Sequence, residues 1–265
     1  MTRVLVVDAQ PLIREGIKSL LDRAPGLVVV GEAADGAEAV ARSGLARPDV
    51  VLIGLRPYDE DGLVTMERIR TRALLRPAPS TDPGQDRGPD QDRGQAPDTA
   101  VRPPGTIVLS GPGTDSDEDV CAAVRAGADG FLHKDVGPSR LIAAVRAVAE
   151  GDMFFSPGIT RRLVDAFATL TDHAPPAGTA NGLDALTPRE VEVMRRVCRG
   201  LSNRGIADVL TISEATVKTH LNRAMVKLGL NSRAQVVTVA YESGLVRPGE
   251  GGPVHRSAAR TPVVH

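Results

Sequence analysis

Cysteine and long apolar runs are scarce in this sequence. It holds two cysteines in 265 residues, Cys121 and Cys198, and no second pair stands nearby to complete a metal site. We interpret both as small core residues. No run of about 18 apolar residues is present, and the first residues lack the basic start, apolar run and cleavage site of a secretory leader. We therefore expect a cytoplasmic protein with no membrane partner, metal or cofactor.

Net charge is also almost absent, at −1 for the whole chain, but it is unevenly divided. Between Leu186 and Arg247, ten Lys or Arg stand against five Asp or Glu, which gives +5 there and −6 elsewhere. A basic module on an acidic body suggests a polyanionic partner, because Lys and Arg near phosphates displace condensed counterions. A merely solvated basic surface would carry the same charge, so charge alone does not decide.

The first half of the chain alternates short β-branched runs with amphipathic stretches. We predict strands at 3–7, 28–31, 50–53, 107–110 and 130–132, and helices at 11–24, 37–46, 63–75, 116–126 and 138–150. Apolar runs without polar alternation, such as Val50-Val51-Leu52-Ile53, suit strands that are covered on both faces. The sequence therefore predicts an α/β domain with a doubly wound, five-stranded parallel sheet.

Two segments rich in Pro and Gly interrupt the chain. Residues 76–104 read RPAPSTDPGQDRGPDQDRGQAPDTAVRPP, and residues 174–182 read APPAGTANG. Such compositions bury too little apolar surface to offset the entropy cost of ordering. We predict a first domain over 1–151 with a disordered insertion at 76–104, a linker helix and flexible linker over 152–182, a second domain over 183–247, and a disordered tail over 248–265.

The second domain reads as a small all-α helix-turn-helix. Thr187-Pro188-Arg189-Glu190 is a capping box that starts a helix, and Gly200 is placed to end it. Further helices are predicted from Ser202, from Ser213 to Leu228, and from Ser232 to Ser243, with the turn at residues 211–213. The apolar face expected for the first helix consists of Val191, Met194, Val197 and the following Leu201.

The third helix of this domain has two distinct faces. Its inner stripe is predicted to be Val217, Leu221, Ala224 and Leu228. Its outer face is predicted to be Lys218, Thr219, Asn222 and Arg223. Entry into a DNA major groove requires polar and basic residues on the second helix of such a pair, although any solvated helix can carry a lysine.

The string LTPREVEVMRRVCRGLSNRGIADVLTISEATVKTHLNRAMVKLGLNSRAQVVTVAYESGL resembles the LuxR-type helix-turn-helix of the NarL/FixJ response regulators. The resemblance implies base contacts from Lys218, Thr219 and Asn222. It implies phosphate or supporting contacts from Thr216, His220, Arg223, Lys227, Ser232 and Arg233. Gly205 stands where the family usually has glutamate, which costs up to ~1 kcal/mol of helix stability. A metal at His220 is disfavoured, because no second ligand stands at ligand spacing.

The first domain resembles the receiver domain of the same family, which has a flavodoxin-like fold, through VLVVDAQPLIREGIKSLL, RPDVVLIGLRPYDEDGL, IVLSG and RAGADGFLHKD. Ser110, Phe131 and Lys134 stand at the family's switch and lysine positions, and Asp8 is one of its two metal-holding acids. Ala9 replaces the second acid, and Gly54 replaces the phosphoacceptor aspartate. Because the nucleophile has no side chain, the sequence excludes aspartyl phosphorylation at the usual site.

Asp59, Glu60 or Asp61 would be substitute phosphoacceptors, although solvated loop acids are the commoner interpretation of such residues. A sharper hypothesis is that Lys134, without its usual partner, pairs with Asp8 and fixes the domain in one conformation. The alternative is a Lys134 side chain merely solvated at the surface. A phosphohydrolase with Asp8 as nucleophile would need a second acid two residues later, where Gln10 stands.

The sequence therefore predicts a non-enzymatic, atypical response regulator that binds double-stranded DNA specifically, as a homodimer reading half-sites about 10 base pairs apart or a multiple of that. In the resembling family the last helix often forms the DNA-bound dimer contact. The apolar residues available for it here are Val236, Val237, Val239 and Ala240, although some of them must simply pack on their own domain. The alternative is a regulator that heterodimerises with a related factor and binds DNA weakly by itself.

Overall fold

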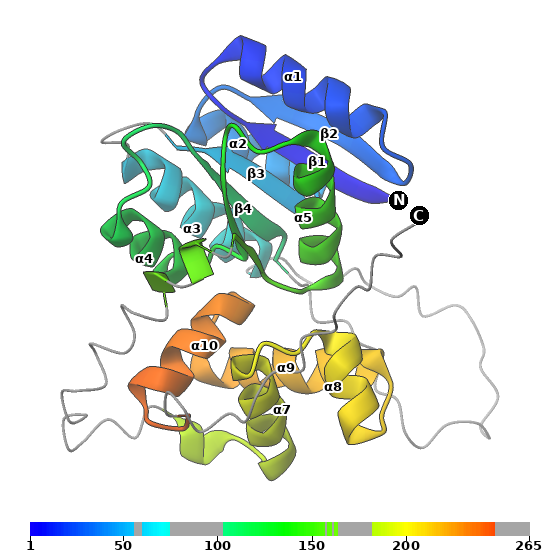
Figure 1. Cartoon of the computed structure of the whole chain (residues 1–265), viewed down its shortest axis with the longest axis vertical. Helices are drawn as coiled ribbons and strands as arrows, with labels where there is room; N and C mark the ends of the chain where they lie inside the picture. Colours follow the sequence, from blue (N-terminus) through cyan, green and yellow to red (C-terminus); the bar gives the residue numbers. More distant parts are fainter. Residues whose placement is uncertain (56–59, 75–102, 157, 161, 164–181, 247–265) are drawn as a thin grey trace, which may run out of the picture.

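The computed structural model describes residues 1–55, 60–74, 103–156, 158–160, 162–163 and 182–246, apart from the side chains of residues 60, 61 and 74. Figure 1 shows an α/β domain lying against a smaller bundle of helices. Most of the predicted insertion (76–102), most of the predicted flexible linker (164–181) and the predicted tail (248–265) lie outside the described residues. None of the helices within the described ranges is long and apolar enough to cross a membrane.

The α/β domain is built on a parallel sheet with the strand order β2-β1-β3-β4-β5-β6. The strands are β1 (Thr2–Val7), β2 (Leu27–Ala33), β3 (Val50–Gly54), β4 (Gly105–Ser110), β5 (Gly130–His133) and β6 (Phe154–Phe155). The five predicted strands are confirmed. The prediction of five strands in total was wrong, because Phe154 and Phe155, assigned to the linker, pair with Gly130 and Phe131.

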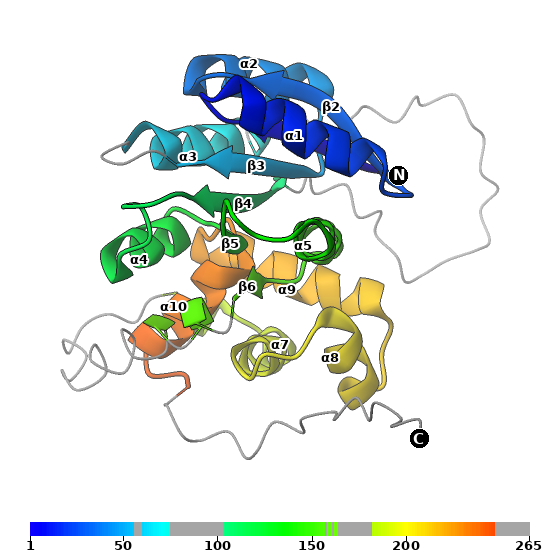
Figure 2. The same cartoon turned by 45° about the horizontal axis from the view of Figure 1, so that its top comes forward.

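Helices cover both faces of this sheet (Figure 2). On one face lie α1 (Pro11–Asp22) and α5 (Pro138–Glu150). On the other face lie α2 (Gly36–Ala46), α3 (Glu60–Leu74) and α4 (Asp117–Arg125). Successive side chains of a strand point to opposite faces, so Val4 and Val6 join the first core while Leu5 and Val7 join the second. The doubly wound α/β prediction is confirmed.

The helical domain begins with a short 3-10 turn, η1 (Leu183–Ala185). The helices that follow are α7 (Pro188–Cys198), α8 (Asn203–Leu210), α9 (Glu214–Leu228) and α10 (Arg233–Glu242). Each is capped as the sequence indicated, by Thr187 with Glu190 or by a serine hydroxyl. Gly229 ends α9 with a φ of 67°, a backbone conformation that glycine adopts without strain. One prediction was wrong: Val193, not Val191, is fully buried on α7.

The two domains share part of one core. Ile159 and Leu163, from the segment after β6, are buried in the same apolar cluster as Val120 and Val124 of α4. Ala234 of α10 belongs to this cluster and is only 3% exposed. The helical domain is therefore docked on the α4 side of the sheet, which both views show.

Candidate functional site

An ion pair occupies the carboxyl end of the sheet, at the point where β1 and β5 finish. The Lys134 ammonium lies 2.7 Å from Oδ2 of Asp8, whose side chain is 1% exposed. The other carboxylate oxygen accepts a hydrogen bond of 2.8 Å from the backbone N–H of Gln10. The predicted pairing of Lys134 with Asp8 is confirmed. Each carboxylate oxygen of Asp8 thus has a contact within the protein, and the side chain is buried rather than exposed to a substrate.

The space beside Gly54 is already filled. A Cβ placed on Gly54 would overlap the Asp8 carboxylate, with Cγ of Asp8 only 2.7 Å away and Nζ of Lys134 3.1 Å away. Real Cβ atoms essentially never come within 3.0 Å of a heavy atom to which they are not connected through the chain, so the Asp8 carboxylate would have to shift. The Asp8 side chain therefore lies where the side chain of residue 54 would begin, and the half-buried Ala9 brings no carboxylate of its own.

The neighbouring switch position is held by residues of β4 and β5. Ser110, which is fully buried, has its hydroxyl 3.1 Å from Nδ1 of His133 and donates to the carbonyl of Leu132 at 3.3 Å. Phe131 is fully buried as well. These contacts turn the Ser110 hydroxyl toward β5. The sequence reasoning did not include His133, because its contact with Ser110 joins residues 23 positions apart.

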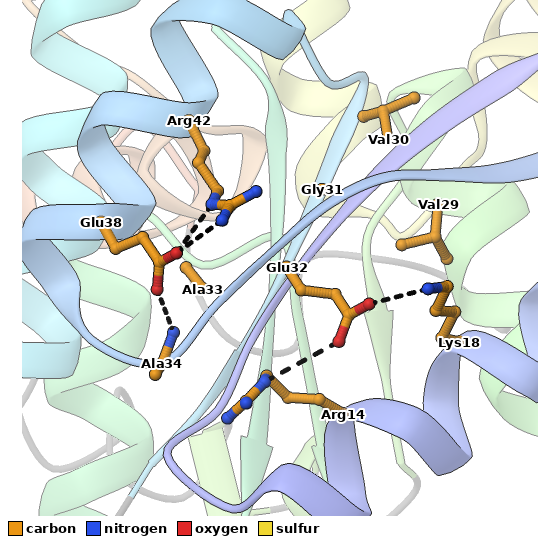
Figure 3. Close-up of a pocket in the computed structure, with 10 residues that line it drawn as sticks. All are labelled: Arg14, Lys18, Val29, Val30, Gly31, Glu32, Ala33, Ala34, Glu38 and Arg42. Atoms are coloured by element: carbon orange, nitrogen blue, oxygen red, sulfur yellow. Dashed lines mark hydrogen bonds and ion pairs between the residues drawn. The ribbon is translucent and has the colours of Figure 1, made fainter.

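A groove crosses the outer strand β2 close to this pocket, between α1 and α2 (Figure 3). Its volume is about 440 Å³. Glu32 faces Lys18 at 3.0 Å and Arg14 at 3.8 Å, while Glu38 pairs with Arg42 at 2.7 Å. Arg14 also donates a 2.6 Å hydrogen bond to the backbone carbonyl of Asp8. The acidic and basic side chains of the groove thus pair with one another, and Arg14 links α1 to the backbone of Asp8 by a hydrogen bond.

The inner stripe of α9 packs as predicted, with Val217, Leu221 and Ala224 buried and Leu228 partly buried. The outer face is divided between two environments. Thr219 is half-buried, and its hydroxyl donates back to the carbonyl of Ala215 at 2.9 Å. Arg223 is exposed.

Lys218 and Asn222, by contrast, point toward the α/β domain. Both line a small cavity of about 30 Å³ at the domain boundary, together with Arg70, Asp129 and residues of the turn before α10. Both side chains are half-buried. Two of the three predicted base-contacting residues thus face the α/β domain in this arrangement, whereas the half-buried Thr219 does not line this cavity.

Comparison with known proteins matches both halves of the chain. Residues 4–79 match the response regulator receiver domain, and residues 184–240 match the bacterial regulatory proteins of the luxR family. The nitrate/nitrite response regulator NarP of Escherichia coli (strain K12) is 34% identical over 231 residues, 87% of this chain and 90% of that protein. The chain belongs to the NarL/FixJ family of response regulators.

Other members of the NarL/FixJ family align over nearly the whole chain. NarL of Escherichia coli (strain K12) is 30% identical over 90% of this chain and 94% of its own length. The transcriptional activator DevR/DosR of Mycobacterium tuberculosis is 32% identical over 96% of this chain and 100% of its own length. Among solved structures, the response regulator ChrA matches with 30% identity, coverage of 92% and 98%, and a TM-score of 0.42.

In this response regulator the receiver and helix-turn-helix domains are joined by polar contacts that the sequence reasoning missed. Arg70 of α3 is 2% exposed and donates to the Asn231 carbonyl in the turn before α10. It also bonds Asp129 at 3.0 Å and the Gly127 carbonyl at 2.7 Å within the receiver. Gln235 of α10 donates to the Arg125 carbonyl at 2.6 Å. A buried arginine thus has hydrogen-bond partners in both domains and stabilises the contact between them.

Two residues expected at DNA phosphates also lie at this boundary. Ser232 is 2% exposed and caps α10. Arg233 is 4% exposed, lies 3.6 Å from Asp152, and bonds Asn203 at 2.7 Å. Asn203 in turn donates to the Glu150 carbonyl at 3.2 Å. Neither Ser232 nor Arg233 can reach a phosphate in this arrangement, because both are covered.

The remaining predicted contacts lie on the open side of the domain. The Thr216 hydroxyl is 2.8 Å from that of Ser213 at the start of α9. Lys227 is exposed but bonds the buried Glu190 at 2.7 Å. Burial alone would raise the pKa of Glu190, yet hydrogen bonds from Lys227 and Thr187 outweigh it and hold that pKa below its usual value. Burial, followed by repulsion from Arg189 and Arg223, lowers the pKa of His220.

The two cysteines pack as half-buried side chains, each against the core of its own domain. Burial raises the pKa of the Cys198 thiol to about 12, so this sulfur stays protonated at neutral pH. Within the described part of the chain, no three His, Cys, Asp or Glu side chains are grouped so that they could hold a metal ion. Asp59 lies outside the described residues, as do the side chains of Glu60 and Asp61.

Proposed function

We propose that this response regulator is a sequence-specific, DNA-binding transcription factor whose activity is set without aspartyl phosphorylation. The overlap of a Cβ at position 54 with the Asp8 carboxylate carries the second part of the proposal. The position has no nucleophile, its space is taken, and the cation that would meet a phosphoryl group is already paired with Asp8. DNA binding is supported by the match to luxR-type regulators and by the basic, partly open face of α9.

The arrangement of the two domains represents a closed form of this regulator. Lys218 and Asn222 face the receiver, so a duplex cannot reach them until the domains separate. The same separation would release α10, whose Ala234 and Thr238 are covered while Val236 and Ala240 belong to the helical core. Opening would therefore free both the base-reading face and a helix for homodimer contact, with abundance, a ligand or a partner protein controlling the equilibrium.

Retention of promoter DNA in a gel-shift assay tests the assignment of α9. Replacing Lys218 and Arg223 together by alanine is expected to abolish retention, because one residue is assigned to base edges and the other to phosphate. The matched control replaces Arg23 and Arg140, two exposed arginines of the receiver, and should leave retention nearly unchanged. Unchanged affinity of the Lys218→Ala/Arg223→Ala variant at moderate salt would refute the assignment. Retention only after addition of a co-purified related factor would instead support the heterodimer alternative.

Intact-mass measurement tests the absence of phosphorylation. The chain is incubated with magnesium and a small-molecule phosphodonor, and no phosphoryl mass increment is expected. Gly54→Asp should also stay unmodified, because Asp8 occupies the space of the new side chain and Ala9 supplies no second acid. A phosphoaspartate in the wild-type chain would overturn the proposal and direct attention to Asp59, Glu60 and Asp61.

A further inference from the structure

Three exposed arginines follow one another along the end of α7 and the start of α8. Arg195 and Arg199 are four residues apart and lie on the same side of α7, since residues i and i+4 are neighbours on a helix. Arg204 lies in the first turn of α8 and is exposed as well. We call these three residues the outer arginine strip. Val193, Met194 and Val197 fill the opposite, inward face of α7.

No described acid is paired with this strip. None of its three guanidinium groups has a hydrogen bond or ion pair with another described residue. Glu192 of α7 could have paired with these arginines, but it is already bonded to Arg189 at 2.7 Å and lies 3.8 Å from Arg196. The outward side of α7 therefore keeps a positive excess, although long arginine side chains are usually paired where an acid is within reach.

The strip also stays accessible in the closed form. The inner face of α7 packs on α9 and α10, and Figures 1 and 2 place α7 on the opposite side of α9 from the sheet. The receiver that covers Lys218 and Asn222 therefore does not cover the outward side of α7. A partner that binds there would need no separation of the domains.

Two further arginines of this domain act on His220 of α9. Arg189 of α7 and Arg223 of α9 lower the pKa of His220 by repulsion, after burial has lowered it. Arg189 is paired with Glu192 at 2.7 Å, whereas Arg223 is exposed. A polyanion lying along the domain would relieve this repulsion.

We propose that the outer arginine strip binds the phosphate backbone of duplex DNA without regard to sequence and does so in the closed form. This inference rests on the proposed DNA-binding function and adds a second, sequence-independent site to it. Guanidinium groups form forked hydrogen bonds to phosphate oxygens. An acidic protein is a poorer fit, because protein hot spots also use buried Trp and Tyr anchors, and the strip contains arginines alone. The closed regulator would thereby remain on DNA before it opens at its specific site.

Salt titration of full-length protein on two duplexes tests this site. One duplex is selected from a random library by the wild-type chain, and the other is a scrambled sequence that lacks the selected site. Fluorescence anisotropy gives the association constant between about 50 and 200 mM KCl. On the scrambled duplex, the plot of log K against log salt has a negative slope. The triple variant Arg195→Gln/Arg199→Gln/Arg204→Gln should make this slope less steep by about 2 to 3, at ~0.9 for each lost phosphate contact.

The control carries the same change of net charge on the receiver, as Arg23→Gln/Arg68→Gln/Arg140→Gln, three exposed arginines without described partners. Its slope should stay within about one unit of the wild type. Circular dichroism and unfolding midpoints verify that both triple variants fold. Equal slopes for the two triple variants would refute DNA binding by the outer arginine strip. Loss of selected-duplex binding in Lys218→Ala/Arg223→Ala would still support the proposed function. Failure of the wild type to bind either duplex would refute both the strip and the proposed function.

Discussion

At the scale of single residues, glycine at position 54 leaves a space that the Asp8 carboxylate fills. The Lys134 ammonium pairs with Asp8, and a Cβ at position 54 would overlap the same carboxylate. The sequence was sufficient to predict this pair, because a lysine and an acid remained at strand ends that meet at one edge of a parallel sheet. It was not sufficient to predict the overlap with position 54, which depends on distances of a few tenths of an ångström.

Lys134→Met tests how strongly the pair holds the receiver together. The variant leaves the buried Asp8 without its cation, and breaking a buried pair from one side costs about 3 kcal/mol. The double variant Asp8→Asn/Lys134→Met should recover most of this loss, since no unpaired charge remains. Guanidinium unfolding of the full chain measures both. As a control, Lys18→Met removes an exposed lysine that pairs with Glu32 and should shift the midpoint far less. Equal losses in the single and double variants would show that the charge of Asp8 is irrelevant.

At the scale of helices and strands, local signals predicted most elements to within a few residues. The caps at Thr187, Ser202, Ser213 and Ser232 fixed the helix starts, because each hydroxyl satisfies an amide of its own first turn. The strand β6 was not predicted, because a segment of two residues is too short to show an alternation of apolar and polar residues. Its pairing with β5 also joins residues that are distant in the sequence. The periodicity of α7 was ambiguous between Val191 and Val193, and only packing against α9 and α10 decides it.

The start of α7 provides a stability prediction that depends on pH. Glu190 has a pKa held below its usual value in the folded protein, so its contribution is present above the unfolded pKa, near 4.5, and is lost as the pH falls through the folded value. Glu190→Gln should therefore reduce the loss of stability as the pH falls, measured by unfolding midpoints at stepped pH. An unaltered acid-side profile in Glu190→Gln would contradict the assigned role.

Thr187→Ala removes the other half of the capping box. This variant should lower the free energy of unfolding by about 1 kcal/mol at neutral pH.

At the scale of the whole molecule, the boundary between the domains decides which predicted DNA contacts are available. Ser232 and Arg233 were assigned to DNA by resemblance, yet both are buried at that boundary. No periodicity or spacing could have revealed this, because Arg233 meets Asp152 only when the domains are docked, and its bond to Asn203 of α8 joins residues 30 positions apart. The cover that one domain provides for the other therefore could not be predicted from sequence.

Arg70→Ala is expected to open the closed form. It removes the bond to the Asn231 carbonyl, and affinity for the selected duplex should rise about tenfold, within the ~5- to 150-fold range of typical coupling between sites. Small-angle scattering should show a larger radius of gyration. Because Arg70 also bonds Asp129 inside the receiver, Gln235→Ala serves as a second variant, which loses the bond to the Arg125 carbonyl and, within its own domain, the bond from the Asn231 N–H. The control is Arg68→Ala, an exposed neighbour on α3. Unchanged affinity and dimensions in both boundary variants would show that the contacts do not restrain the domains.

The filled space beside Gly54 also bears on descent. If the proposed absence of phosphotransfer holds, its recovery would need an aspartate at 54, an acid at 9 and withdrawal of Asp8 from Lys134. The first of these changes, taken alone, would bring two carboxylates together without a second acid at position 9. Under the proposal, three coordinated substitutions or rearrangements would then separate this chain from phosphotransfer, and a single substitution would bring no gain for selection to act on.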